Sequence, residues 1–446
     1  MLQIRVKKGL NDGKTYPLEK RKLLVGRTAD CDIALDVDSP ASRHHAEIYL
    51  SEGKWRIRDL GSMNGTLLNE DRIVDAELAP GDEVTIGDSV FVVEPDGTTP
   101  STPAEPRQPA PEQREIQAIV EQMSAKTKLI EREIGKAIIG QKEIVRELLT
   151  AIISNGHVLM IGMPGLAKTM MIRTVSDVLD LNFRRVQFTP DLMPSDITGT
   201  DILEVDEATG RKEYRFIRGP IFTNILLADE INRTPPKTQA ALLEAMQEHR
   251  VTAAGETYPL APPFFVLATQ NPLEQEGTYP LPEAQLDRFM FSIYIDYPNE
   301  AEEEQIAKVT TTNREVTLRK VLTGEEIVEL QKAVRDLPVS DHVVKYATRL
   351  VRSTRPGDAR APDFIKRWVH CGAGPRATQY LVVAAKARAV IAGRLLVSTD
   401  DVRASARPVL RHRMFTNFTA DSESVDTDKI VQKLLETVPE PGEKDY

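Results

Sequence analysis

One eight-residue segment combines small residues with a lysine and a hydroxyl: Gly162-Met163-Pro164-Gly165-Leu166-Ala167-Lys168-Thr169. Small residues let backbone N–H groups approach phosphate oxygens, and the start of a following helix adds partial positive charge. Lys168 would reach the β- and γ-phosphates of a nucleotide, and Thr169 would offer its hydroxyl to Mg²⁺. The segment therefore predicts a phosphate-binding loop, with a strand–turn–helix that binds no ligand as the alternative.

The residue before the lysine departs from the usual pattern, because Ala167 stands where a glycine is typical. Alanine resists positive φ. We therefore expect Ala167 to adopt an ordinary backbone conformation.

Two further apolar runs end in polar groups. Residues 224–230 end in Asp229 and Glu230, and residues 264–270 lead to Asn271. At the carboxyl edge of a parallel sheet, Asp229 would hold Mg²⁺ and Glu230 would orient the attacking water. Asn271 would hydrogen-bond the γ-phosphate or that water. The alternatives are a helix cap for the acidic pair and a strand-ending asparagine before a proline. Arg288, flanked by apolar residues, is by itself compatible with a surface ion pair.

The surrounding pattern predicts the elements that position these groups. Apolar residues 157–161 form a strand before the loop, helical spacing follows from Met170 to Val178, and residues 183–188 alternate as a strand. Residues 113–298 therefore form an α/β core with a parallel sheet. From Asn299 to residue 446 the spacing is helical, which predicts a small all-α lid with an acidic tail.

The order of these motifs resembles the AAA+ ATPases, and within them the MoxR family. The matching stretches are Ile138–Gln141, Gly165–Thr169, Asp229–Arg233, Ala241–Glu248 and Ala268–Pro272, followed by Leu286-Asp287-Arg288-Phe289. The family tolerates alanine before the loop lysine.

The resemblance implies ATP and Mg²⁺ as ligands and a ring, commonly hexameric, with ATP between subunits. Arg288 would be an arginine finger acting on the neighbour's γ-phosphate, and Asn271 would be sensor 1. Arg376, near a helix start, would be sensor 2, with a surface arginine at a helix start as the alternative. Ile139 and Gly140 would lie against the adenine. Two inserted loops, residues 189–220 and 250–262, would face the pore or the substrate. Proteins with von Willebrand factor A domains are implied partners.

Residues 1–95 read as short alternating strands, which predicts an all-β sandwich. Three loop motifs, Gly26-Arg27, Ser42-Arg43-His44-His45 and Ser62-Met63-Asn64-Gly65-Thr66, resemble the forkhead-associated (FHA) domain, a phosphothreonine-peptide reader. The resemblance implies that Arg27 and Ser42 hold the phosphate beside Arg43 and that Asn64 binds the peptide backbone. His45 and Gly65 would brace the loops. The residue types also fit a phosphate without any reference to the family, because an arginine fork and a hydroxyl group can both donate hydrogen bonds to phosphate oxygens. The alternatives are solvated loop arginines, an FHA-like fold whose site has decayed, and an unrelated sandwich.

Residues 96–112 carry five prolines among polar residues and predict an extended tether. Thr98, Thr99, Ser101 and Thr102 are either phosphorylation sites or ordinary linker residues.

The length and composition of the chain are typical of a soluble globular protein of several domains. The chain has 446 residues and a formal net charge of −10, which argues against general nucleic-acid binding. No apolar run has the length of a membrane span, and the first residues alternate like a strand rather than a signal peptide. Its two cysteines, Cys31 and Cys371, fall in different predicted domains, so we expect a cytosolic protein without a disulfide framework.

The leading hypothesis is a ring-forming ATPase that remodels or assembles partner proteins and is recruited or regulated through the phosphothreonine reader. One alternative is a phosphorylation-gated scaffold in which ATP sets the assembly state with little turnover. The other is a DNA-directed motor, which the acidic charge disfavours.

Overall fold

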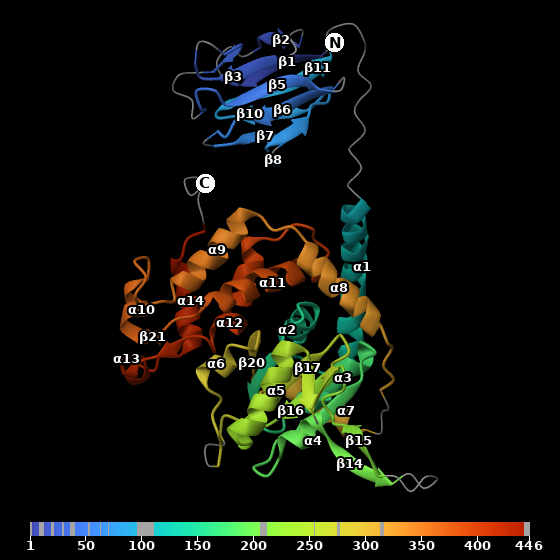
Figure 1. Cartoon of the computed structure of the whole chain (residues 1–446). Helices are drawn as coiled ribbons and strands as arrows, with labels where there is room; N and C mark the ends of the chain where they lie inside the picture. Colours follow the sequence, from blue (N-terminus) through green and yellow to red (C-terminus); the bar gives the residue numbers. More distant parts are fainter. Residues whose placement is uncertain are drawn as a thin grey trace. The chain divides into compact units, whose positions relative to one another are not determined.

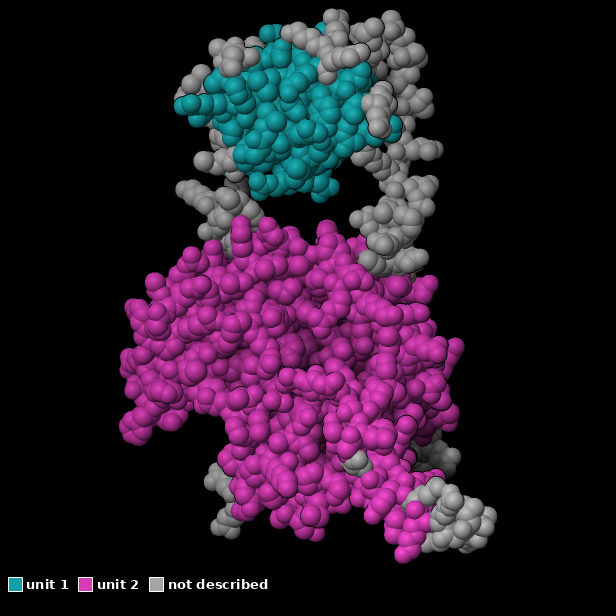
Figure 2. All heavy atoms as spheres, in the orientation of Figure 1, with its two compact units in different colours: residues 1–109 teal, residues 110–446 magenta. Residues whose placement is uncertain are grey.

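The computed structural model describes residues 2–8, 13–18, 22–28, 31–35, 41–51, 54–62, 64–69, 71–95, 111–205, 212–253, 255–273, 277–312 and 316–440. The chain divides into two compact units, residues 1–109 and 110–446 (Figure 2). The predicted tether, with its four candidate phosphorylation sites, lies outside the described residues except where helix α1 begins at Pro111. Residues 206–211, within the first predicted inserted loop, also lie outside them.

The first unit is the predicted β-sandwich, built from a six-stranded and a five-stranded sheet. The first sheet has the order β2-β1-β11-β10-β7-β8 and the second the order β4-β3-β5-β6-β9. The strands span Leu2–Lys8 (β1), Thr15–Pro17 (β2), Lys22–Gly26 (β3), Ile33–Ala34 (β4), Ala46–Ser51 (β5), Lys54–Asp59 (β6), Thr66–Leu68 (β7), Asp71–Ile73 (β8), Asp75–Glu77 (β9), Glu83–Ile86 (β10) and Ser89–Pro95 (β11). Alternate residues of both sheets, among them Ile4, Val25, Ile57 and Val84, form one buried apolar cluster.

The second unit contains the predicted parallel sheet, with the order β13-β16-β19-β12-β20. Its strands span Val158–Gly162 (β12), Phe183–Gln187 (β13), Ile225–Asp229 (β16), Phe265–Gln270 (β19) and Phe291–Ile295 (β20). Every residue of β16 is buried, as expected for a strand covered on both faces. This order places β16 between β13 and β19, so polar residues at the ends of all three strands meet at one edge.

Helices and small hairpins surround this sheet. The helices of the core span Pro111–Ile134 (α1), Lys142–Ile153 (α2), Lys168–Val178 (α3), Pro194–Thr198 (α4), Pro236–Glu248 (α5) and Glu283–Leu286 (α6). The first insertion contains α4 and the hairpin of β14 (Gly199–Val205) with β15 (Lys212–Arg218). The second contains a hairpin about Gly255, formed by β17 (Arg250–Ala253) and β18 (Glu256–Pro259).

The C-terminal part is the predicted helical lid, of which residues 324–437 gather on one side of the sheet in Figure 1, whereas residues 300–310 lie beside the core elements. Its elements span Glu300–Thr310 (α7), Gly324–Asp336 (α8), Asp341–Arg352 (α9), Asp363–Trp368 (α10), Val369–Cys371 (β21), Pro375–Ile391 (α11), Thr399–Leu410 (α12), Phe415–Thr416 (β22), Phe418–Ser422 (α13) and Thr427–Thr437 (α14). Helix α1 packs against both α3 of the core and α11 of the lid, and buried residues of core and lid share one apolar cluster. The lid is therefore fixed to the sheet through a common core.

Candidate functional site

The predicted phosphate-binding loop connects β12 to α3, as expected. Gly165 has φ +86°, which an L side chain rarely adopts. Ala167 has φ 54° and ψ 22°, so the expectation of an ordinary backbone at this residue is wrong. A left-handed alanine costs about 1–2 kcal/mol. Hydrogen bonds from the Lys168 ammonium group to the Gly162 and Met163 carbonyl oxygens hold the loop in shape, so the surrounding structure sustains this strain.

A cleft of about 430 Å³ opens over this loop, which is the size range of small-molecule sites. The described residues that line it come from the loop, α3, β13 and the ends of β16 and β19: Pro164, Gly165, Leu166, Ala167, Lys168, Thr169, Met170, Arg185, Asp229, Glu230, Thr269 and Asn271. The structure therefore brings the predicted loop, acidic and amide residues together.

Both oxygens of the Asp229 carboxylate, which lines the cleft, accept hydrogen bonds from neighbouring side chains. One of its oxygens accepts a hydrogen bond from the Thr269 hydroxyl, which in turn accepts one from the Glu230 N–H. The other oxygen accepts two from Arg185, at 2.7 Å from Nη2 and 2.9 Å from Nε. An arginine thus holds the carboxylate predicted to bind Mg²⁺.

The Glu230 side chain is also paired. Its Oε2 atom accepts a hydrogen bond from the Gln187 amide at 2.7 Å and lies 3.0 Å from Nη1 of Arg233. The Asn271 amide oxygen accepts from the Leu273 N–H at 3.1 Å. Both side chains line the cleft.

Sequence reasoning missed Arg185 and Gln187. They alternate along β13, so they share one face of that strand, and β13 pairs with β16 with Gln187 opposite Asp229. The sequence did carry a signal, because these two polar residues lie two positions apart within residues 183–188, which were predicted to form a strand. Knowing that they face the acidic pair required the strand order.

The donor set fits a magnesium nucleotide. The first turn of α3 offers backbone N–H groups that Ala167 cannot cap with a side chain, and Lys168 adds a positive charge beside them. Thr169 and Asp229 supply a hydroxyl and a carboxylate, the hard oxygen ligands that Mg²⁺ prefers.

The other predicted nucleotide residues are not among the residues that line this cleft. The Gly162 carbonyl faces the lysine, as described above. Ile139 and Gly140 precede α2, and Gly140 has φ +71° with the Glu302 carboxylate of α7 close beside it.

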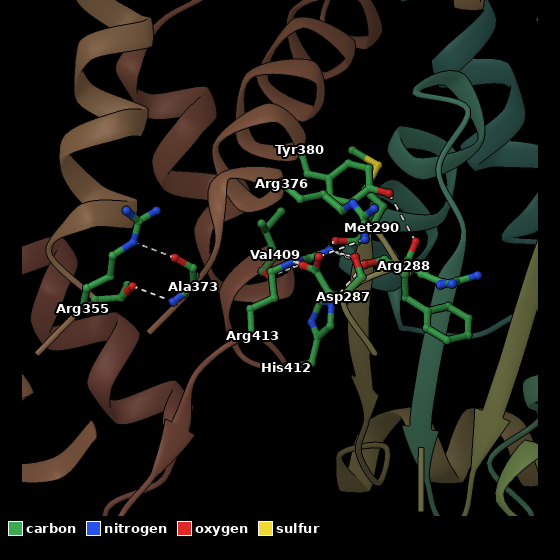
Figure 3. Close-up of polar contacts among 12 residues, drawn as sticks. Asp287, Arg288, Met290, Arg355, Ala373, Arg376, Tyr380, Val409, His412 and Arg413 are labelled. Atoms are coloured by element: carbon green, nitrogen blue, oxygen red, sulfur yellow. Dashed lines mark hydrogen bonds and ion pairs between the residues drawn. The ribbon is translucent and has the colours of Figure 1, made fainter. Parts of the chain in front are cut away.

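The two predicted arginines that act on phosphate also lie outside the cleft. Nη1 of Arg288 donates to the Leu243 carbonyl of α5 at 2.8 Å, and Arg288 lines a second cavity of about 280 Å³. Arg376, at the start of α11, donates to the Asp287 carboxylate at 2.9 Å (Figure 3). Arg376 therefore contacts the residue that directly precedes Arg288.

The predicted peptide-binding residues gather on loops of the first unit. The Arg27 N–H donates to the Ser42 carbonyl at 3.2 Å. Buried His45 accepts from the Ser42 N–H at 3.0 Å through Nδ1, and its Nε2 lies 3.0 Å from the Gly65 carbonyl. The imidazole therefore ties the Ser42 loop to the loop that carries Asn64. Arg27, Arg43 and Asn64 are exposed.

Asp59 supports the Asn64 loop from below. Burial acts to raise its pKa, but hydrogen bonds from Ser62, Thr66 and Gly61 outweigh burial and leave the pKa below its usual value. The loop is thus built on a charged carboxylate that its own residues solvate.

Comparisons with known proteins match both units. A family model for the ATPase family associated with various cellular activities (AAA) matches residues 157–291, and an AAA lid domain model matches residues 365–434. Chaperone MoxR1 of Mycobacterium tuberculosis is 40% identical over 325 residues, covering 72% of this chain and 85% of that protein. A crystal structure from Cytophaga hutchinsonii is 39% identical and covers 75% of this chain and all of the other, with a TM-score of 0.69.

The first unit has its own relatives. A model described as the cytoplasmic domain of an inner membrane component of T3SS matches residues 5–97. The glycogen accumulation regulator GarA of Mycolicibacterium smegmatis is 45% identical over 82 residues, which cover 18% of this chain and 51% of that protein. A structure described as an analysis of phosphothreonine-dependent FHA domain interactions is 29% identical, covering 22% of this chain and 98% of that one, with a TM-score of 0.20.

Across the described part of the chain, no helix is both long and apolar enough to cross a membrane. The second unit pairs the predicted phosphate-binding loop with an acidic strand end and a helical lid, and relatives of known family match it over most of their length. The chain belongs to the MoxR family of AAA+ ATPases and carries an FHA-like domain in its first unit.

Proposed function

We propose that this ATPase hydrolyses ATP between the subunits of a ring, commonly a hexamer in this class, and uses the cycle to remodel or assemble partner proteins. The observation that carries the proposal is the separation of the two halves of the site. Lys168, Asp229 and Glu230 line the cleft, whereas Arg288 and Arg376 lie outside it. A neighbouring subunit that supplies both arginines completes the site.

Each cleft residue has a distinct task in this scheme. The α3 N-terminus and Lys168 bind the phosphates, and Glu230 orients and polarises the attacking water as a general base. Asn271 hydrogen-bonds the γ-phosphate or that water. Thr169 and Asp229 would hold Mg²⁺, which neutralises phosphate charge when it is bound. Positioning and charge neutralisation supply most of the catalysis in phosphoryl transfer.

Substitution of Arg288 tests the trans arrangement directly. Arg288→Ala should leave nucleotide affinity within a factor of about two and lower ATP turnover by roughly 10³-fold, the range for arginine fingers. Binding of a fluorescent ATP analogue and phosphate release measure the two quantities on the same preparation. Normal turnover by Arg288→Ala would refute the trans role.

The FHA-like domain adds a reader of phosphothreonine to the motor. Arg27 and Ser42 would hold the phosphate beside Arg43, and Asn64 would bind the peptide backbone. The side chains of Arg27 and Arg43 are exposed, and His45 connects the neighbouring loops through hydrogen bonds. Exposed guanidinium groups on loops held in this way suit a dianionic phosphate. The partner is a phosphothreonine-bearing protein, either a client or an adaptor, and the family resemblance favours one with a von Willebrand factor A domain.

A peptide titration tests the reader. Arg27→Ala should weaken binding of a phosphothreonine peptide at least tenfold in fluorescence anisotropy. Lys54→Ala serves as the control, because Lys54 is an exposed cation of β6 paired with Glu77. Equal affinities for the phosphorylated and unphosphorylated peptide would instead indicate a decayed site.

A further inference from the structure

The turn that carries Arg288 is held by the lid of its own chain (Figure 3). Arg413 follows α12 and reaches back 126 residues in sequence to Asp287. Its Nε donates to the Asp287 carboxylate at 2.8 Å and its Nη2 to the Asp287 carbonyl at 2.9 Å. Further hydrogen bonds run to the carbonyl groups of Phe289, Met290 and Val409.

This arginine uses its whole donor capacity. A guanidinium group has five N–H donors, and each of the five contacts above takes one. Four of them go to residues 287–290, on both sides of Arg288. The Arg413 side chain is only 1% exposed, so a lost contact cannot be replaced by water.

A second lid residue holds the backbone of Arg288 itself. The Tyr380 hydroxyl of α11 donates to the Arg288 carbonyl at 3.2 Å, and the Arg413 guanidinium lies 4.9 Å from the centre of the Tyr380 ring. Lid residues therefore hydrogen-bond to the residue before Arg288, to the two residues after it and to the carbonyl group of Arg288 itself.

We propose that Arg413 is a positioning residue that sets the place of Arg288 for the nucleotide of a neighbouring subunit. The inference rests on the trans role of Arg288 proposed above. A finger is useful only where its charge meets the charge that develops in the transition state, and a misplacement of about 1 Å costs roughly 10²-fold in rate. Arg413 fixes the backbone from which that finger extends, although it touches no nucleotide itself.

Mixed rings isolate this role. Glu230→Gln subunits donate an intact Arg288 but cannot hydrolyse their own ATP, and Arg288→Ala subunits have an intact cleft but no finger. Mixing the two should restore ATP hydrolysis, because the first completes the site of the second. Arg413→Met is then placed either in the donor or in the acceptor subunit, at the same cost to folding in each case.

The two placements should differ. In the donor, Arg413→Met should lower the restored rate by roughly 10²-fold. In the acceptor, which has no finger to position, it should leave that rate within a factor of about two. Arg413→Lys in the donor keeps the charge but not the fork and should recover part of the rate. Tyr380→Phe should give a smaller loss with the same asymmetry, and it decides the question if Arg413→Met does not fold.

The outcomes separate the two proposals. Failure of the unsubstituted mixture to hydrolyse ATP overturns the trans role of Arg288. Restoration without any loss from donor Arg413→Met or Tyr380→Phe overturns the positioning role alone. Equal losses in donor and acceptor also overturn it, since they reveal a contribution to stability only. Arg411→Met in the donor, a buried arginine bonded to Asp428 instead of Asp287, is the matched control.

Discussion

At the scale of single residues, Arg185 competes for the carboxylate that would hold magnesium. It is half-exposed and makes two hydrogen bonds to one oxygen of Asp229. A solvent-screened pair of this kind contributes up to about 1 kcal/mol, or roughly fivefold in an equilibrium constant. We therefore expect Arg185→Ala to bind a fluorescent ATP analogue at lower Mg²⁺ concentrations. The Mg²⁺ concentration at half-maximal binding should fall by up to roughly fivefold.

The comparison with Arg184→Ala controls for the loss of one positive charge, because Arg184 is the preceding residue of β13 and points to the other face of the strand. If Arg185→Ala weakens nucleotide binding at every Mg²⁺ concentration, the arginine binds phosphate and does not compete with the metal ion.

A buried histidine makes the stability of the motor depend on pH. Nδ1 of His157 accepts from the Val266 N–H at 3.0 Å and Nε2 donates to the Met246 carbonyl at 3.0 Å, which fixes the neutral tautomer. Burial is the main reason that the pKa of His157 falls to about 4 from an ordinary 6.5. The folded state thus resists protonation that the unfolded chain accepts. Its contribution is present above pH 6.5 and is lost as the pH falls toward 4, by about 3 kcal/mol in all.

Thermal unfolding of the full chain between pH 7.5 and pH 5 measures this effect. His157→Gln keeps one acceptor and one donor but does not titrate, so its midpoint should fall less steeply with acid than that of the wild type. His370→Gln, at an exposed position of β21, should leave the slope unchanged. Parallel curves for His157→Gln and the wild type would exclude His157 as a source of the pH dependence.

At the scale of elements, the loop before α3 stores strain at Ala167. Glycine elsewhere in a helix costs about 1 kcal/mol relative to alanine, because it loses more freedom on folding. At residue 167, where φ is 54°, this cost is offset, because glycine adopts the left-handed backbone conformation without the penalty of about 1–2 kcal/mol that alanine carries. Ala167→Gly should therefore unfold at or above the wild-type midpoint, whereas Ala125→Gly, at an exposed position of α1, should unfold below it. A similar loss for both variants in calorimetry would mean that Ala167 is not left-handed in solution.

The parallel sheet, the loop before α3 and the lid show how much of the fold and of the site sequence patterns can predict. Buried apolar runs that end in glycine, acidic or amide residues predicted the strands β12, β16 and β19, and the carboxyl-edge rule predicted that Lys168, Asp229 and Asn271 meet in one cleft. Ala167 misled because intrinsic backbone preference lost to the hydrogen bonds of the loop. Arg413 carried no local signal, since its partner Asp287 lies 126 residues earlier and only the packed lid brings them together.

At the scale of the whole molecule, the question is whether turnover or assembly carries the function. A remodeller needs the cycle, whereas a scaffold needs only the ATP-bound ring. Glu230→Gln separates these possibilities, because an amide cannot act as the general base but has nearly the shape of the carboxylate. Loss of a general base costs about 10²–10⁴-fold in rate.

We expect Glu230→Gln to bind ATP normally, to assemble in its presence and to reduce turnover by at least about 10²-fold. Because an idle subunit slows a shared cycle without stopping it, adding it to wild-type protein should depress ATP turnover by more than its own fraction. Light scattering measures assembly, and phosphate release across a series of mixing ratios measures turnover. Lys168→Ala, which removes the ammonium group proposed to bind phosphate, is the control for a subunit that does not bind ATP. A strictly proportional fall with Glu230→Gln would mean that the subunits hydrolyse ATP independently, which contradicts a cycle shared around a ring.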